Sequence, residues 1–176
     1  RNCGRGPAEC GVPAGAPFVL IDAGVMHLDL TLNERGLPFD WRYGPRDVPL
    51  SDFAYQTERH GFAAVGLKPL APVHVRLVRQ PNDDIALTWV RRTRIGGDAW
   101  DAPAVPLGES REVYEVDIVD GADVVRTLAV ATPSAIYSAA DQIADFGAPP
   151  STLTVRVHQL SDVVGRGTAR EVTRNV

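Results

Sequence analysis

Strict alternation of apolar and polar residues over short runs marks the second half of the chain, and a period of two is the pattern of β-strands. The alternating runs occupy residues 73–78, 85–90, 114–119 and 153–158. Asp120 and Gly121 form a hairpin-turn signal after the third run, and residues 124–130 supply the returning strand. About seven short strands, separated by turn residues at regular spacing, predict an all-β sandwich over residues 70–176.

Trp89 lies at the inward end of the second alternating run, on the same side as Ile85 and Leu87. A large aromatic side chain at such a position is far more often packed in a core than presented to a ligand. We therefore expect Trp89 to be buried between the two sheets.

The first 69 residues show weaker patterns. Residues 1–17 are dense in Gly, Pro and Ala, which favours turns and extended chain over regular elements. Residues 18–69 contain short apolar runs broken by turn signals, including a hairpin turn at residues 22–24, and predict a small all-β subdomain. The predicted organisation is thus a Gly/Pro-rich segment, this subdomain, and the sandwich over residues 70–176, in which residues 139–147 form one helical turn or a loop.

Composition and charge argue against several classes of partner. Apolar residues make up 44% and charged residues 23% of the chain, which is typical of a folded globular protein. The formal net charge is -4, from 18 basic and 22 acidic side chains without long blocks of one sign, so no nucleic-acid partner is expected. Apolar stretches such as residues 16–23 are far shorter than the roughly 20 residues of a membrane-spanning helix, so no membrane span is expected. Because the chain begins with Arg1 and not Met, we expect it to be a piece of a longer polypeptide or a processed product.

No catalytic, cofactor-binding or metal site is predicted, and we do not expect an enzyme. Cys3 and Cys10 have no CxxC spacing and no two further ligands nearby, so they form either a disulfide or two free thiols. The four histidines are scattered along the chain. The serines include no GxSxG motif, and no Gly-rich loop meets a strand and a helix as in phosphate-binding sites.

Aromatic residues in loop-like sequence are the candidates for contact with a partner. Trp41 and Tyr43 form one group, and Trp100 with Asp98 and Asp101 forms the other. Aromatic rings flanked by polar groups occur in sugar-binding surfaces and in oligomer interfaces. For Trp100, packing of a loop onto the sandwich is an equally good interpretation.

The predicted sandwich has four features of a known domain. They are Pro72 before the first strand, Trp89 in the second, the run YEVDI at residues 114–118 in the third, and the run VRVHQLSDVVGRGTA at residues 155–169. In these features the chain resembles the fibronectin type III domain. The resemblance implies a two-sheet, all-β module that serves as a scaffold or in binding.

Three longer runs carry a narrower resemblance. They are GLKPLAPVHVRLVR at residues 66–79, WVRRTRIGGDAWDAPAVPLGESREVYEVDIVDG at residues 89–121 and YSAADQIADFG at residues 137–147. Together they look like the C-terminal part of the large tail-tip protein, the baseplate hub and host-specificity protein, of gene transfer agents and related tailed phages. This resemblance spans residues 61–173 and implies a structural component at the tip of a phage-like tail.

The tail-tip resemblance implies a homotrimer around the tail axis that contacts other tail and baseplate proteins and faces a glycan or protein of the host envelope. It implies a location at the tail tip of a virion-like particle that is assembled in the cytoplasm and released from the cell. It implies no catalytic residue for this chain, because the family's glycosidase-like barrel lies in a part that this sequence does not contain. An alternative from another class is a carbohydrate-binding accessory domain of a secreted hydrolase, since fibronectin-like sandwiches serve there too.

Overall fold

The computed structural model describes residues 28–97 and 104–176. The chain divides into two compact units, Arg1–Arg35 and Gly36–Val176. The hairpin turn predicted at residues 22–24 lies outside the described part of the chain. The domain boundaries predicted from the sequence stay predictions.

The described part of the first unit holds one short 3-10 helix, η2 (Leu32–Glu34). The Glu34 carboxylate accepts hydrogen bonds from the backbone N–H and the hydroxyl of Thr31, at 2.7 and 2.8 Å. These two hydrogen bonds lower the pKa of Glu34 below its usual value.

The described part of the second unit consists of strands joined by turns and loops, with one α-helix. Its elements are, in chain order, β1 (Pro38–Tyr43), β2 (Gln56–Gly61), η3 (Val65–Leu67), β3 (Val73–Arg79), β4 (Ile85–Val90), β5 (Tyr114–Asp120), β6 (Asp123–Val130), β7 (Ser134–Tyr137), α1 (Ala139–Phe146), β8 (Thr152–Ser161), β9 (Gly165–Arg166) and β10 (Arg170–Asn175).

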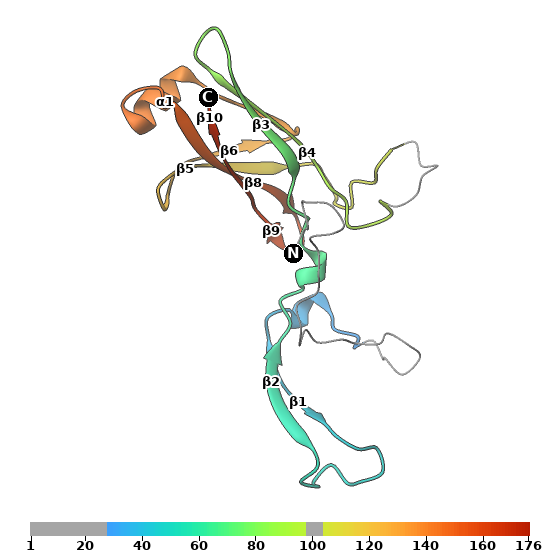
Figure 1. Ribbon diagram of the computed structural model, residues 1–176. Helices are drawn as coiled ribbons and strands as arrows, with labels where there is room; N and C mark the ends of the chain where they lie inside the picture. Colours follow the sequence, from blue (N-terminus) through green and yellow to red (C-terminus); the bar gives the residue numbers. More distant parts are fainter. Residues whose placement is uncertain (1–27, 98–103) are drawn as a thin grey trace, which may run out of the picture. The chain divides into compact units, whose positions relative to one another are not determined.

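Two antiparallel sheets form a sandwich from β3 onward (Figure 1). One sheet has the order β3-β4-β7, and the other has the order β10-β8-β5-β6, with the short β9 paired to β8. The first, second and fifth strands of the sandwich therefore share one sheet, and the remaining strands share the other. This strand order is that of a fibronectin type III-like sandwich, so the predicted all-β fold class is confirmed. A separate two-stranded sheet, β1–β2, precedes the sandwich in the chain.

The facing sides of the two sheets bury one apolar core. The alternation predicted for β4 is confirmed, because Ile85, Leu87 and Trp89 are all buried. The Trp89 ring meets the Tyr114 ring of the other sheet edge-on, with 5.2 Å between the ring centroids. The buried members of the core are Val75, Ile85, Leu87, Trp89, Tyr114, Val116, Ile118, Ala135, Tyr137, Leu153, Val155, Val157 and Val172.

Residues 139–147 form more regular structure than the helical turn or loop expected from the sequence. Helix α1 runs over 8 residues, and the Ser138 hydroxyl caps its first turn by accepting a backbone N–H at 3.1 Å. Gly147 ends the helix in the left-handed region, with a φ of 78° that glycine adopts without strain.

Polar contacts fasten α1 to the sandwich. The buried Gln142 amide donates to the backbone carbonyls of Asp83 and Tyr137, at 2.9 and 3.0 Å. Asp145 accepts two hydrogen bonds from Arg126 of β6, at 2.7 and 2.9 Å, and one from the Tyr137 hydroxyl at 2.8 Å. A helix this short is marginal by itself, so these long-range contacts decide its formation. Local sequence pattern does not show such contacts.

Trp89→Ala is expected to lower the free energy of unfolding by about 3 to 5 kcal/mol, because the change leaves a large cavity between the sheets. The next residue, Val90, is 52% exposed, so Val90→Ala should change the same free energy by less than about 1 kcal/mol. Urea denaturation of both variants and of the unchanged chain measures the two differences. Equal losses would contradict the placement of Trp89 in the core.

Candidate functional site

The three aromatic residues of β1 lie on one face of the β1–β2 hairpin, and an Asp–Arg ion pair lies on the other. Successive residues of a strand point to opposite faces, so Phe39, Trp41 and Tyr43 of β1 share one face. Asp40 lies opposite Arg59 of β2 on the second face, with 3.8 Å between their charged groups. Sequence reasoning predicted contact roles for Trp41 and Tyr43 within a loop, but both lie on a strand.

The aromatic side chains pack against one another. Trp41 meets Phe39 and Phe62 edge-on, with ring centroids 6.0 and 5.4 Å apart. Phe62 also meets His60 edge-on, at 4.6 Å. The indole N–H of Trp41 donates to the backbone carbonyl of His60 at 3.1 Å. The polar group of Trp41 is thus satisfied within the hairpin, whereas Tyr43 is 52% exposed.

The loop that joins the two strands, residues 44–55, has internal contacts of its own. Tyr55 covers Gly44 so closely that an added Cβ would lie 2.8 Å from the ring. The Tyr55 hydroxyl donates to the carbonyl of Pro45 at 3.0 Å. The Arg42 guanidinium lies over the same ring, 5.8 Å from its centre. These contacts give the loop a defined shape.

Leu50 and Phe53 are exposed on this loop, and we call them the tip anchor. Phe53 is 98% exposed and Leu50 is 63% exposed. The turn that carries Phe53 is hydrogen-bonded, because Asp52 accepts the backbone N–H of Ala54 at 2.9 Å. Packing within the chain does not explain a fully exposed phenylalanine on a structured loop, and exposed apolar groups mark contact surfaces. Sequence reasoning missed both residues, since an apolar residue in a loop does not show whether it folds back onto the chain.

The other predicted contact residues, Trp100, Asp98 and Asp101, lie outside the described residues, as do Cys3 and Cys10. Their predicted roles stay predictions. Of the residues predicted to contact a partner, Trp41 and Tyr43 are the two that lie in the described part of the chain.

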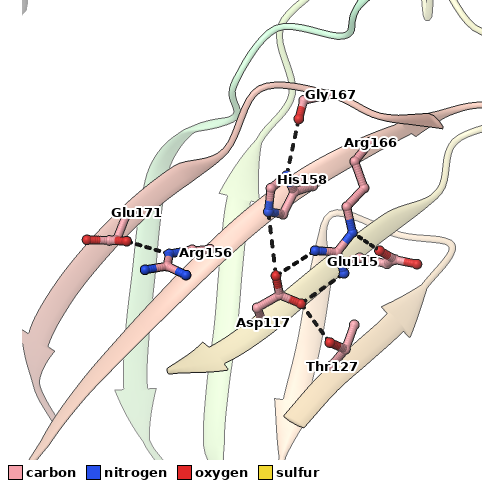
Figure 2. Close-up of polar contacts among 8 residues, drawn as sticks. All are labelled: Glu115, Asp117, Thr127, Arg156, His158, Arg166, Gly167 and Glu171. Carbon is pink, nitrogen blue, oxygen red and sulfur yellow. Dashed lines mark hydrogen bonds and ion pairs between the residues drawn. The ribbon is translucent and has the colours of Figure 1, made fainter. Parts of the chain in front are cut away.

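A cluster of polar side chains lies on the outer face of the β10-β8-β5-β6 sheet (Figure 2). Asp117 of β5 is at its centre, with 3% of its side chain exposed. Arg166 of β9 donates to both carboxylate oxygens, at 2.8 and 3.0 Å, and the Thr127 hydroxyl donates at 2.6 Å. Nε2 of His158 lies 3.6 Å from the same carboxylate, and Nδ1 lies 3.1 Å from the carbonyl oxygen of Gly167.

Burial and hydrogen bonding act on Asp117 in opposite directions. Burial alone would raise its pKa, but the hydrogen bonds from Arg166 and Thr127 and the nearby positive charge outweigh burial. The pKa of Asp117 is therefore lowered from its usual value of 3.8, and the group is ionised at neutral pH. Donors of the chain itself occupy both carboxylate oxygens. The cluster therefore fastens β9 to the sheet, and its carboxylate is not placed to act on a substrate.

Ion pairs extend this cluster across the sheet (Figure 2). The strand register places Asp117, Arg156 and Glu171 in one row over β5, β8 and β10. Nε of Arg156 lies 2.5 Å from the Glu171 carboxylate, and Arg166 also pairs with Glu115 of β5. Charges of opposite sign face each other across neighbouring strands, which stabilises the pairing of the sheet.

Within residues 28–97 and 104–176, no group of three or more His, Cys, Asp or Glu side chains is arranged to hold a metal ion. In the same two ranges, no helix combines the length and the apolar character that a membrane span requires. The predicted lack of catalytic, cofactor-binding and metal-binding residues stays a prediction for the whole chain.

No protein-family model matches the chain, and no curated protein matches it. Among solved structures, the chain is similar to the rat CD45 extracellular region, domains d3-d4, with 11% sequence identity and a TM-score of 0.45. The alignment covers 100% of this chain and 83% of that one. The fold assignment follows from the strand order of the sandwich and does not depend on this similarity.

Asp117→Asn is expected to lower the free energy of unfolding at neutral pH by about 1 to 3 kcal/mol, because Arg166 and Thr127 lose a buried charged acceptor. Folding lowers the pKa of Asp117, so its stabilisation is complete above its unfolded pKa of about 3.9 and is lost as the pH falls through the lower folded value. The difference between variant and unchanged chain should therefore shrink as the pH falls below the unfolded pKa. Chemical denaturation across this pH range measures it.

The matched control is Asp47→Asn, at an exposed position in the loop of the hairpin. Its effect on the free energy of unfolding should stay within about 0.5 kcal/mol at every pH. A loss in Asp117→Asn that persists unchanged in strong acid would show that the carboxylate charge is not what stabilises the cluster.

Gly44→Ala is expected to loosen the loop of residues 44–55, because the added Cβ would lie 2.8 Å from the Tyr55 ring. Hydrogen exchange of the Ala54 and Tyr55 amides, which are bonded to Asp52, should become roughly tenfold faster. Gly66→Ala is the control, since nothing lies within 4 Å of the carbon added there. Equal exchange rates in the two variants would exclude the contact of Gly44 with Tyr55 as the element that shapes the loop.

Proposed function

We propose that the chain is a structural component of the tip or baseplate of a phage-like tail of the gene transfer agent type, where it assembles with other tail proteins and contacts the host surface. The tail-tip resemblance of residues 61–173 supports this role. One structural observation carries it, namely that the structured loop of the β1–β2 hairpin presents the tip anchor, with Phe53 98% exposed. An exposed apolar anchor serves contact with another surface and performs no chemistry.

The sandwich supports the same role as a rigid carrier. Its inner faces form one closed core, so relative movement of the two sheets would expose apolar surface. The polar cluster around Asp117 is satisfied by partners within the chain and holds the outer face in one arrangement. A carrier of this kind keeps its contact surfaces in fixed positions, which an assembly of many subunits requires.

The proposal specifies partners and location. Other tail and baseplate proteins are the direct partners, and the chain forms a homotrimer around the tail axis. A glycan or a protein of the host envelope is the distal partner. The particle is assembled in the cytoplasm and carries the chain at its tail tip after release.

Labelling of purified particles tests the proposed location. Antibody fragments raised against the sandwich should bind one end of the tail in electron micrographs, and mass spectrometry of the particles should detect the chain. Fragments against the major capsid protein are the control and should label the head. Absence of the chain from the particles, or label on the head, would overturn the tail-tip role.

The accessory-domain alternative predicts a different result. In that case the isolated chain is monomeric and binds a defined oligosaccharide. Tyr43 is the exposed aromatic of the hairpin, whereas the Trp41 N–H is already bonded to His60. Oligosaccharide binding that disappears in Tyr43→Ala, in a chain absent from particles, would favour the alternative.

A further inference from the structure

The tip anchor is an apolar surface that is exposed to water. Phe53 is 98% exposed, so its own chain leaves it uncovered. The loop around it is shaped by the contact of Tyr55 with Gly44 and by the Asp52 hydrogen bond, which limits the ways in which the anchor can be buried. Burial in a pocket of another molecule would remove this apolar surface from water.

The outer face of the β3-β4-β7 sheet offers an apolar pocket. The strand register sets Val78, Ala86 and Ile136 in one row across the three strands, and Val78 and Ile136 are 53% and 57% exposed. The row leads into a shallow pocket of about 340 Å³, which we call the outer pocket. Residues of β4 and β7 and one residue of β6 line it, namely Ala86, Leu87, Thr88, Ser134, Ala135, Ile136 and Val130. Pockets that hold small ligands begin at about 300 Å³, so the outer pocket has room for a single aromatic side chain.

The charges around the two surfaces are complementary. Arg76 of β3 lies opposite Thr88, beside the apolar row, and is exposed without an ion pair among the described residues. In the loop of the hairpin, Asp47 and Asp52 outnumber Arg46. Docking of this loop on the outer face of the sheet would bring a carboxylate toward Arg76.

The same charges disfavour a membrane as the partner of the anchor. Residues 38–61 carry three basic and four acidic side chains, which are Arg42, Arg46, Arg59, Asp40, Asp47, Asp52 and Glu58. Elements that bind an anionic membrane surface surround their apolar residues with basic ones. The hairpin has a slight excess of acidic side chains, so a protein pocket fits it better.

We propose that the tip anchor of one copy inserts into the outer pocket of a second copy of this chain. This inference rests on the proposed assembly role and names its partner. Anchor and pocket are different surfaces, so the contact is head-to-tail, and copies joined in this way close into a ring when the rotation between them allows it. Phe53 fills the pocket, and a carboxylate of the loop lies near Arg76.

Thiol trapping tests the contact in the full chain, with Cys3 and Cys10 replaced by Ser. One protein carries Phe53→Cys and the other carries Ile136→Cys. A disulfide needs Cβ atoms within about 4.5 Å, so mixing the two under mild oxidation should give a linked heterodimer, whereas either protein alone should give few homodimers. Val65→Cys, at a position 70% exposed and outside both surfaces, is the control when mixed with Ile136→Cys.

Sedimentation measures the strength of the same contact. Phe53→Asp and Ile136→Asp should each lower the association constant roughly 10- to 100-fold, because a charge enters the buried apolar contact. An equimolar mixture of the two should form dimers and nothing larger, since one protein keeps its pocket and the other keeps its anchor. Val65→Asp should associate like the unchanged chain. Thermal unfolding verifies that each variant is folded.

Trapping no better than that of the Val65 control, or association unaffected by Phe53→Asp, would overturn the contact. If the antibody fragments label the tail tip and no linked heterodimer forms, the contact between copies is wrong and the tail-tip role is supported. If the heterodimer forms and the chain is absent from particles, the contact is supported and the tail-tip role is wrong.

Discussion

The packing of the two sheets through Trp89 and Tyr114 is the interaction on which the rest of this structure depends. Burial of apolar area contributes about 25 cal/mol per Å², so the shared core outweighs any single ion pair on the outer faces. The closed core fixes which side of each main strand of the sandwich points outward. The polar cluster and the outer pocket use side chains that this arrangement leaves outside, whereas the docking of α1 also uses the hydroxyl of the core residue Tyr137.

The two outer faces are used differently. On the outer face of the β10-β8-β5-β6 sheet, Asp117 and its partners form hydrogen bonds with one another and hold β9 in place, so the polar groups there are satisfied within the chain. On the three-stranded face, Val78 and Ile136 remain exposed in an apolar row. Exposed apolar surface marks contact sites, so a partner protein is expected to bind the outer face of the β3-β4-β7 sheet and not the polar outer face of the other sheet.

The β1–β2 hairpin is stabilised by contacts of its own. Two strands alone are marginally stable in water, so β1 and β2 need contacts beyond their backbone ladder. Edge-on packing of Trp41 with Phe39 and Phe62 supplies one such contact, and the contact of Tyr55 with Gly44 supplies another in the loop. The same contacts that stabilise the hairpin hold Phe53 in its exposed position, which connects the stability of this element to its proposed use.

Alternation of apolar and polar residues is a local property, so the all-β class, the inward position of Trp89 and most strands of the sandwich could be predicted from the sequence. The sequence also singled out Trp41 and Tyr43, but not their place on a strand. The tertiary structure alone decided helix α1, the pairing of Asp117 with Arg166 across 49 positions, and the exposure of Phe53. Each of these features depends on which distant segments of the chain contact one another. Such contacts produce no periodic pattern of residues, so the local sequence does not predict them.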